Sequence, residues 1–123
     1  MSGNKLLVDT NILIYLLEGN EELKRMLDDF NLYVSFISEI EILANGNLKA
    51  EDRGAVKALL EGVYIIDINE EIKDFCIDNR IKFGLKIPDS FVLATAQWMQ
   101  LPLLTSDREF EKAKNNTAEV IIY

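Results

Sequence analysis

Residues 5–11 read Lys-Leu-Leu-Val-Asp-Thr-Asn, a short apolar run followed at once by three residues that favour helix N-termini. The apolar run predicts a buried strand, and the polar residues after it predict that a helix starts there. A strand that leads directly into a helix is typical of α/β folds, so this class is the first expectation.

The same alternation continues outward along the chain. We expect further strands at 32–36, 63–68, 103–105 and 120–123, and helices at 12–18, 21–30, 38–44, 51–61, 70–82, 88–100 and 106–114. Strands that alternate with helices predict a largely parallel sheet built from right-handed crossovers. The 123 residues contain neither a repeat nor a linker, so residues 1–123 are expected to form a single domain.

Composition limits the possible chemistry. The chain has one cysteine, Cys76, and no histidine, which excludes an intramolecular disulfide, a Cys/His zinc site and histidine-based acid–base catalysis. Hydrolysis would have to use carboxylates, Lys, Tyr or metals. The net charge of -8 argues against a plain nucleic-acid-binding module. It argues less against a metal-dependent nuclease, because bound cations would offset clustered carboxylates.

The hydrophobic residues are distributed as in an ordinary globular protein. They make up 49% of the chain, beside 28% charged residues. No apolar run approaches the ~20 residues that a membrane-spanning helix needs, and the first residues do not resemble a signal peptide. We therefore expect a cytoplasmic protein without membrane contact.

Two aspartates follow expected strands. Asp9 comes directly after the first strand and Asp107 two residues after the fourth, at the strand ends where α/β proteins place their sites. Each also has a plain structural explanation as a helix-capping or first-turn acid. For Asp9 this explanation is weakened because Thr10 or Asn11 could cap the helix equally well. For Asp107, a capping box begun by Ser106 would leave it as a first-turn acid.

A third aspartate heads an apolar helix stripe. If Pro88 begins a helix, Asp89 shares one face with Val92, Leu93 and Ala96. A carboxylate at that place must be paired, hydrogen-bonded to a helix end or bound to metal, because burying it alone is costly.

Two glutamates, Glu39 and Glu41, belong to the helix expected at 38–44. Both lie at the margin of its apolar face, and periodicity does not choose between them. Taken alone, both are explained as solvated side chains. Hard divalent cations prefer oxygen ligands, and one or two such ions can activate water and shield a phosphodiester. Metal-dependent hydrolysis is therefore the most natural chemistry for a cluster of acids in a chain without histidine.

Four segments resemble, in order, the motifs of the PIN-domain family, and especially the toxins of VapBC-type toxin–antitoxin pairs. They are residues 8–11, 34–43, 87–96 and 104–110. The resemblance selects Glu41 over Glu39, because the family's Glu follows a Ser or Thr by three positions. It implies a three-layer α/β/α fold with a mostly parallel five-stranded sheet. It also implies that Asp9, Glu41, Asp89 and Asp107 hold Mg²⁺ or Mn²⁺ and act in an endoribonuclease that leaves 5′-phosphate and 3′-hydroxyl ends.

The resemblance also suggests supporting groups and partners. Thr105 and Asn11 are candidates for hydrogen bonds that orient the metal ligands. Basic residues near the third acid are candidates for contacts to an RNA backbone, although solvated surface charge explains them equally well; they are Arg80, Lys82 and Lys86. The expected partners are an RNA substrate, a cognate antitoxin whose tail carries Arg, and a second copy in a homodimer.

Other functions stay open at this stage. A catalytically silent PIN-like interaction module would share the fold and the acids but not the activity. A response-regulator receiver would need an acidic pair after the first strand, where this chain has the single Asp9. Cleavage of DNA by a flap-nuclease relative is chemically possible, but the chain lacks the insertions expected of one.

Overall fold

The computed structural model of the chain describes residues 4–114 and 118–123. At its centre lies a five-stranded sheet in the order β3-β2-β1-β4-β5, in which each neighbouring pair is parallel. The strands are β1 (Lys5–Val8), β2 (Asn31–Ser35), β3 (Tyr64–Ile66), β4 (Leu103–Thr105) and β5 (Val120–Ile122). The predicted α/β class and parallel sheet are confirmed.

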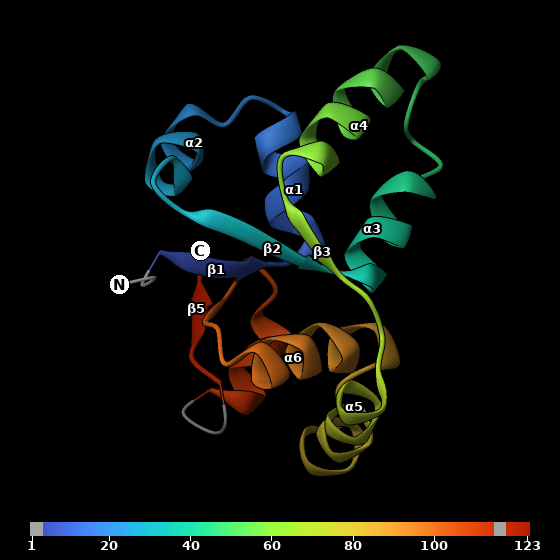
Figure 1. Cartoon of the computed structure of the whole chain (residues 1–123), viewed down its shortest axis with the longest axis vertical. Helices are drawn as coiled ribbons and strands as arrows, with labels where there is room; N and C mark the ends of the chain where they lie inside the picture. Colours follow the sequence, from blue (N-terminus) through green and yellow to red (C-terminus); the bar gives the residue numbers. More distant parts are fainter. Residues whose placement is uncertain (1–3, 115–117) are drawn as a thin grey trace.

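Helices cover both faces of this sheet. The helices are α1 (Thr10–Leu17), α2 (Glu21–Leu27), α3 (Phe36–Leu43), α4 (Arg53–Glu61), α5 (Glu70–Phe83) and α6 (Ile87–Met99), with short 3-10 helices η1 (Ala50–Asp52) and η2 (Arg108–Ala113). α1, α2 and α4 lie on one face, and α5 and α6 lie on the other (Figure 1). This is the expected three-layer arrangement. In the described part of the chain, no helix is long and apolar enough to cross a membrane.

The central strand β1 contributes to two cores because its side chains alternate between the faces. Leu6 and Val8 pack in the core below α1, α2 and α4. Leu7 points the other way and packs with Val92 and Leu93 of α6. All five side chains are almost completely buried, so the register of β1 fixes both layers at once.

Some element boundaries differ from the predicted ones. The segment predicted as a helix at 106–114 is the 3-10 helix η2, which starts at Arg108. The second predicted helix ends earlier, at Leu27. The predicted strand at 63–68 has only three residues in the ladder, since it is an edge strand paired on one side by β2. The order and type of the other elements agree with the prediction.

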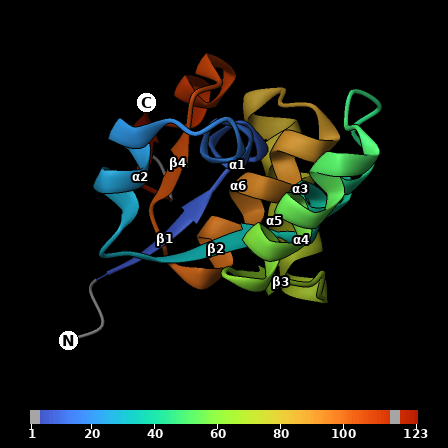
Figure 2. The same cartoon turned by 90° about the horizontal axis from the view of Figure 1, so that it is seen from above.

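The carboxyl ends of the parallel strands meet at one edge of the sheet. β1 and β4 are neighbours, and the residues that follow them are Asp9 and the segment Ser106–Asp107. The arrow of β1 points toward the start of α1 (Figure 2). The fold therefore brings strand-end aspartates to the same edge.

Candidate functional site

A cavity of about 560 Å³ lies at this edge, and all four predicted acids line it: Asp9, Glu41, Asp89 and Asp107. Asp9 follows β1, Glu41 lies on α3, Asp89 is in the first turn of α6 and Asp107 precedes η2. Glu39 is not among the lining residues. The remaining lining residues are Thr10, Asn11, Ile14, Ile40, Ala44 and Asn45. Four segments far apart in sequence thus contribute one carboxylate each.

Asp9 is the N-cap of α1 as well as a wall of the cavity. Its side chain is 6% exposed. Oδ1 accepts a hydrogen bond from the Thr10 backbone N–H at 2.7 Å, and Oδ2 accepts one from the Thr105 hydroxyl at 2.8 Å. The expectation that Thr10 or Asn11 could cap the helix instead is wrong, because α1 starts at Thr10, two residues earlier than predicted.

Thr105 connects two of the acids, as the sequence suggested for a supporting group. Its fully buried hydroxyl donates to Asp9 and accepts from the Asp107 backbone N–H at 3.0 Å. Asp107 in turn caps η2, since its Oδ1 accepts from the Glu109 N–H at 2.9 Å. The predicted capping box with Ser106 as the cap is therefore wrong, and Asp107 takes that role.

Thr10 is a connecting residue that the sequence reasoning did not identify as part of the site. Its hydroxyl lies 2.6 Å from Glu41 Oε1 and 3.0 Å from Ser38 Oγ. A carboxylate only accepts, so Thr10 donates its single hydroxyl hydrogen to Glu41. Ser38 is completely buried, and the signal for it was its position three residues before Glu41. Thr10 thus bonds to Asp9 through its backbone and to Glu41 through its side chain.

Asp89 lies where its negative charge is unfavourable. It heads the predicted stripe, and Val92, Leu93 and Ala96 are buried below it. Partial burial raises its pKa to about 6, the charges of the other three cavity acids add to the rise, and Lys86 opposes it. Among the described residues no hydrogen bond reaches its carboxylate.

Burial also raises the pKa of Asp9, although the bonds from Thr105 and Thr10 partly oppose this and the charges of Glu41 and Asp107 add to it. The ion pairs of the described residues lie elsewhere: Lys73–Glu70, Arg108–Glu111 and Lys112–Glu109. The cavity therefore holds concentrated negative charge without a neutralising side chain in contact.

This donor set fits a hard divalent cation. All four groups are carboxylates, which Mg²⁺ and Mn²⁺ prefer, and a cation would relieve the mutual repulsion that adds to the effect of burial on the pKa values of Asp9 and Asp89. Within residues 4–114 and 118–123, no three acids are gathered closely enough to hold one ion among them. This agrees with Mg²⁺ sites that use one or two carboxylates directly and keep several waters.

The three basic candidates lie in different environments. The Arg80 guanidinium donates to the Leu85 carbonyl at 2.6 Å, so it is partly engaged in holding the segment between α5 and α6. Lys82 and Lys86 are exposed. Lys86 is the N-cap residue of α6 and its charge acts on Asp89, which makes it the basic candidate with the clearest relation to the cavity.

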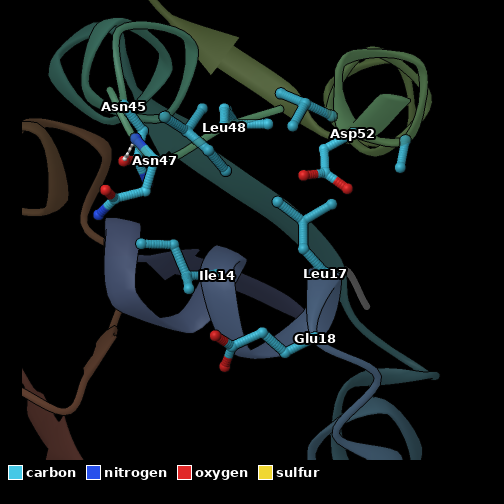
Figure 3. A pocket seen from close by; sticks show the side chains of 10 residues that line it. Ile14, Leu17, Glu18, Asn45, Asn47, Leu48 and Asp52 are labelled. Atoms are coloured by element: carbon cyan, nitrogen blue, oxygen red, sulfur yellow. Dashed lines mark hydrogen bonds between the residues drawn. The ribbon is translucent and has the colours of Figure 1, made fainter. Parts of the chain in front are cut away.

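A second pocket of about 250 Å³ adjoins the acidic cavity and shares Ile14 and Asn45 with it. Leu17 of α1 faces Leu48 and Asp52 across this pocket (Figure 3), and Glu18, the C-cap residue of α1, also lines it. Six of its ten lining residues are apolar, and Glu18 and Asp52 are the acidic ones. The two hollows together form a surface that is apolar at one end and acidic at the other.

Comparison with known proteins covers most of the chain. Residues 6–116 match the family model described as PIN domain. A chain in a toxin–antitoxin complex from Klebsiella pneumoniae is 31% identical and superposes with a TM-score of 0.80, over 94% of this chain and 95% of that one. No curated protein matches the sequence significantly.

More distant solved structures share the fold. VapBC2 from Rickettsia felis, bound to a DNA fragment from the promoter, is 14% identical with a TM-score of 0.82, over 97% of this chain and 98% of that one. VapBC-5 from Mycobacterium tuberculosis is 18% identical with a TM-score of 0.71, over 98% and 99%. At these identities the likeness concerns the fold alone.

Proposed function

This chain belongs to the PIN domain family, and from that premise we propose that it is a divalent-metal-dependent endoribonuclease. The observation that carries the proposal is the cavity at the carboxyl edge of the sheet, lined by Asp9, Glu41, Asp89 and Asp107. Each acid comes from a different segment, and in the described part of the chain none forms an ion pair with a basic side chain. A cluster with this charge is costly for the fold and is explained by a cation.

The residues of the site have separate tasks in this proposal. Asp9 and Asp89 are the principal ligands, Glu41 binds directly or through water, and Asp107 completes the site. A bound Mg²⁺ or Mn²⁺ supplies an activated water near neutral pH and shields the charge of the phosphate oxygens. Thr105 and Thr10 each donate one hydrogen bond to Asp9, which leaves the remaining lone pairs of its carboxylate to face the cavity. Asn11 lines the same cavity and is a further candidate for orienting a ligand.

We expect the affinity for the substrate to be weak. Lys82 and Lys86 are exposed near the amino end of α6, where they can contact phosphates, and Arg80 has a partly structural role. Phosphate contacts set the affinity and position of RNA rather than its sequence preference. We propose RNA as the substrate because such contacts lie beside the acids that would act on a phosphodiester.

We further propose that the chain is the toxin of a toxin–antitoxin pair. The similar chain at 31% identity comes from a toxin–antitoxin complex. The apolar pocket beside the acidic cavity suits an antitoxin segment that inserts an apolar side chain between α1 and α4 and directs an Arg toward the carboxylates (Figure 3). In Ala55→Arg the new side chain would fill this pocket, so inhibition by the cognate antitoxin should weaken while RNA cleavage persists.

A homodimer is proposed from the apolar residues of α2 and of the turn that follows it. Leu23 and Leu27 of α2 are in the core, whereas Met26 and Phe30 are 50% and 37% exposed. An exposed apolar share beside a packed helix is a common feature of self-association surfaces. Light scattering on size-exclusion fractions would report the mass, and Met26→Asp is expected to lower it to that of the single chain.

The test of the activity is cleavage of a structured RNA mixture with Mg²⁺ or Mn²⁺. Asp9→Asn keeps the shape of the side chain and its capping acceptor but removes the charge that would hold metal. Asp29→Asn makes the same change of charge at an exposed position outside the cavity. We expect cleavage by the wild type and Asp29→Asn, and none by Asp9→Asn or in EDTA.

Cleavage by Asp9→Asn at the wild-type rate would point to a contaminating nuclease or another site. No cleavage by the wild type in any of several RNA mixtures would favour the catalytically silent interaction module. Binding of the antitoxin by an inactive wild type would strengthen that second interpretation.

A further inference from the structure

α5 and α6 are joined by a buried pair of amide side chains. Asn79 Nδ2 donates to Gln97 Oε1 at 2.9 Å, and Gln97 Nε2 donates to Asn79 Oδ1 at 3.1 Å. The two residues are 2% and 8% exposed. A buried amide is costly unless its hydrogen bonds are made, so this reciprocal pair fixes the direction in which the Asn79 amide faces.

The second N–H of the Asn79 amide donates to the backbone carbonyl of Ser90 at 3.1 Å. Ser90 is the neighbour of Asp89 in the first turn of α6. The same turn is held on its other side, because the Ser90 hydroxyl and the Arg80 guanidinium both donate to the Leu85 carbonyl, at 3.1 and 2.6 Å. Polar contacts from α5 thus hold the chain both before and after Asp89.

Asp89 differs in this respect from Asp9, whose two oxygens are held by Thr10 and Thr105. Among the described residues the Asp89 carboxylate accepts no hydrogen bond of its own. Its position in the cavity therefore depends on the backbone turn that carries it. A ligand oxygen must lie within a few tenths of an ångström of its ideal distance from the ion, so a small movement of this turn weakens coordination.

We propose that Asn79 is a positioning residue for Asp89: through its bond to the Ser90 carbonyl it sets where the Asp89 carboxylate stands, and so how tightly the acidic cavity holds a divalent cation. This inference rests on the proposed metal-dependent function. It gives α5, which contributes no residue to the lining of the cavity, a defined part in building the site.

The alternative is that the amide pair serves packing alone. Thr95 offers a matched control, since it also lies on α6, is completely buried and donates through Oγ1 to the Phe91 carbonyl at 2.8 Å. That bond stays within α6 and does not reach α5. Thr95→Val therefore removes a buried hydrogen bond from the same helix without touching the link to Ser90.

The experiment compares the wild type with Asn79→Leu, Asn79→Leu/Gln97→Leu and Thr95→Val. The double variant replaces the amide pair by an apolar pair, so it protects against a loss of folding in the single variant. Calorimetric titration with Mn²⁺ alone gives the metal affinity. Hydrogen exchange of the Ser90 amide, which donates to the Lys86 carbonyl, reports the order of the first turn in the metal-free protein.

We expect Mn²⁺ binding to weaken about tenfold in both Asn79 variants, the effect usual for groups that orient a metal ligand. Exchange at Ser90 should accelerate in both by more than the change in global stability explains. Thr95→Val should match the wild type in both measurements. Wild-type Mn²⁺ affinity in the folded double variant would overturn the positioning role alone, whereas a wild type that binds no Mn²⁺ would overturn the metal site and this inference with it.

Discussion

Asp89, a proposed metal ligand, opposes the stability of the fold that carries it. Its pKa rises to about 6, first through partial burial and then through the charges of Asp9, Asp107 and Glu41. The folded protein thus binds a proton at Asp89 more tightly than the unfolded chain does. Above pH ~6 the carboxylate is charged and this contribution destabilises the fold, and the penalty fades as the pH falls toward the ordinary value of 3.8.

The first prediction follows from the direction of this pKa shift. In EDTA, Asp89→Asn should melt at a higher temperature than the wild type at about pH 7.5, and the difference should shrink toward pH ~4.5. Because the side chain is partly exposed, solvent screening limits the gain to about 1 kcal/mol, or roughly 3–5 °C. Added Mn²⁺ should reverse the order by raising the melting temperature of the wild type more. A lower melting temperature for Asp89→Asn in EDTA at the higher pH would contradict the prediction.

The second prediction concerns the hydroxyl of Thr105. Thr105→Val keeps the shape but removes the donor to Asp9 and the acceptor for the Asp107 N–H. We expect urea unfolding to show a loss of about 1–3 kcal/mol, because a buried carboxylate loses a partner, together with roughly tenfold weaker Mn²⁺ binding. Thr105→Ser restores the hydroxyl and should recover most of both losses; if it behaves like the valine variant, packing of the methyl group is the cause.

At the scale of residues, the sequence predicts which acids gather in the cavity better than it predicts the hydrogen bonds that they accept. The strand ends and the helix stripe indicated Asp9, Asp107 and Asp89 without any family argument, whereas Glu41 was selected only by resemblance. The bond from Thr10 to Glu41 spans 31 positions in sequence, and no local pattern predicts which hydroxyl will meet which carboxylate. Such contacts become visible only when the sheet has brought α1 and α3 together.

At the scale of single elements, the ends of α5 and α6 make an instructive pair. Both C-caps have left-handed backbone, with φ of 66° at Gly84 and 56° at Gln100. Glycine adopts this conformation without penalty, and other residues pay about 1 kcal/mol. α5 therefore ends on a favourable residue and α6 on an unfavourable one.

The third prediction compares one substitution at each of these two C-caps. A Cβ at position 84 would have no atom within 4 Å, so Gly84→Ala should cost about 1 kcal/mol through backbone strain alone. Gln100 is exposed, and Gln100→Gly should raise the free energy of unfolding by a few tenths to about 1 kcal/mol. Guanidinium unfolding curves measure both changes. Equal stability of Gly84→Ala and the wild type would mean that the cap relaxes without strain.

Helix and strand identity follow from periodicity, but boundaries depend on tertiary contacts. The run at 106–114 has helical composition, and yet η2 starts only at Arg108, because Asp107 caps it and Thr105 holds the Asp107 N–H. Edge strand β3 is shorter than its apolar run because only β2 is available to pair with it. In each case the sequence predicted a helical or extended segment, and contacts with neighbouring residues and strands determined its boundaries.

At the scale of the whole molecule, net charge and sheet topology have opposite effects on the binding of the proposed RNA substrate. The net charge is -8, which repels a polyanion, whereas the parallel sheet collects four carboxylates where cations would bind. In the proposed function, bound cations would make the cavity locally less negative, so few basic residues would be needed to bring a phosphate to the site. Composition alone predicted poor RNA binding, and the proposal of an RNA substrate rests on the arrangement of the sheet.

The last prediction follows from that balance and concerns the salt dependence of RNA cleavage at constant Mg²⁺. Three basic candidates near the amino end of α6, at about 0.7 released counterions per contact, predict a slope of log(kcat/KM) against log salt of about -2. Lys86→Ala should make it shallower by about 0.7, because Lys86 is exposed and its charge acts on Asp89. Lys24→Ala on α2, outside the cavity lining, should leave the slope unchanged. A steep slope that does not respond to Lys86→Ala would mean that RNA crosses another face, with the basic residues of α4, Arg53 and Lys57, as the next to test.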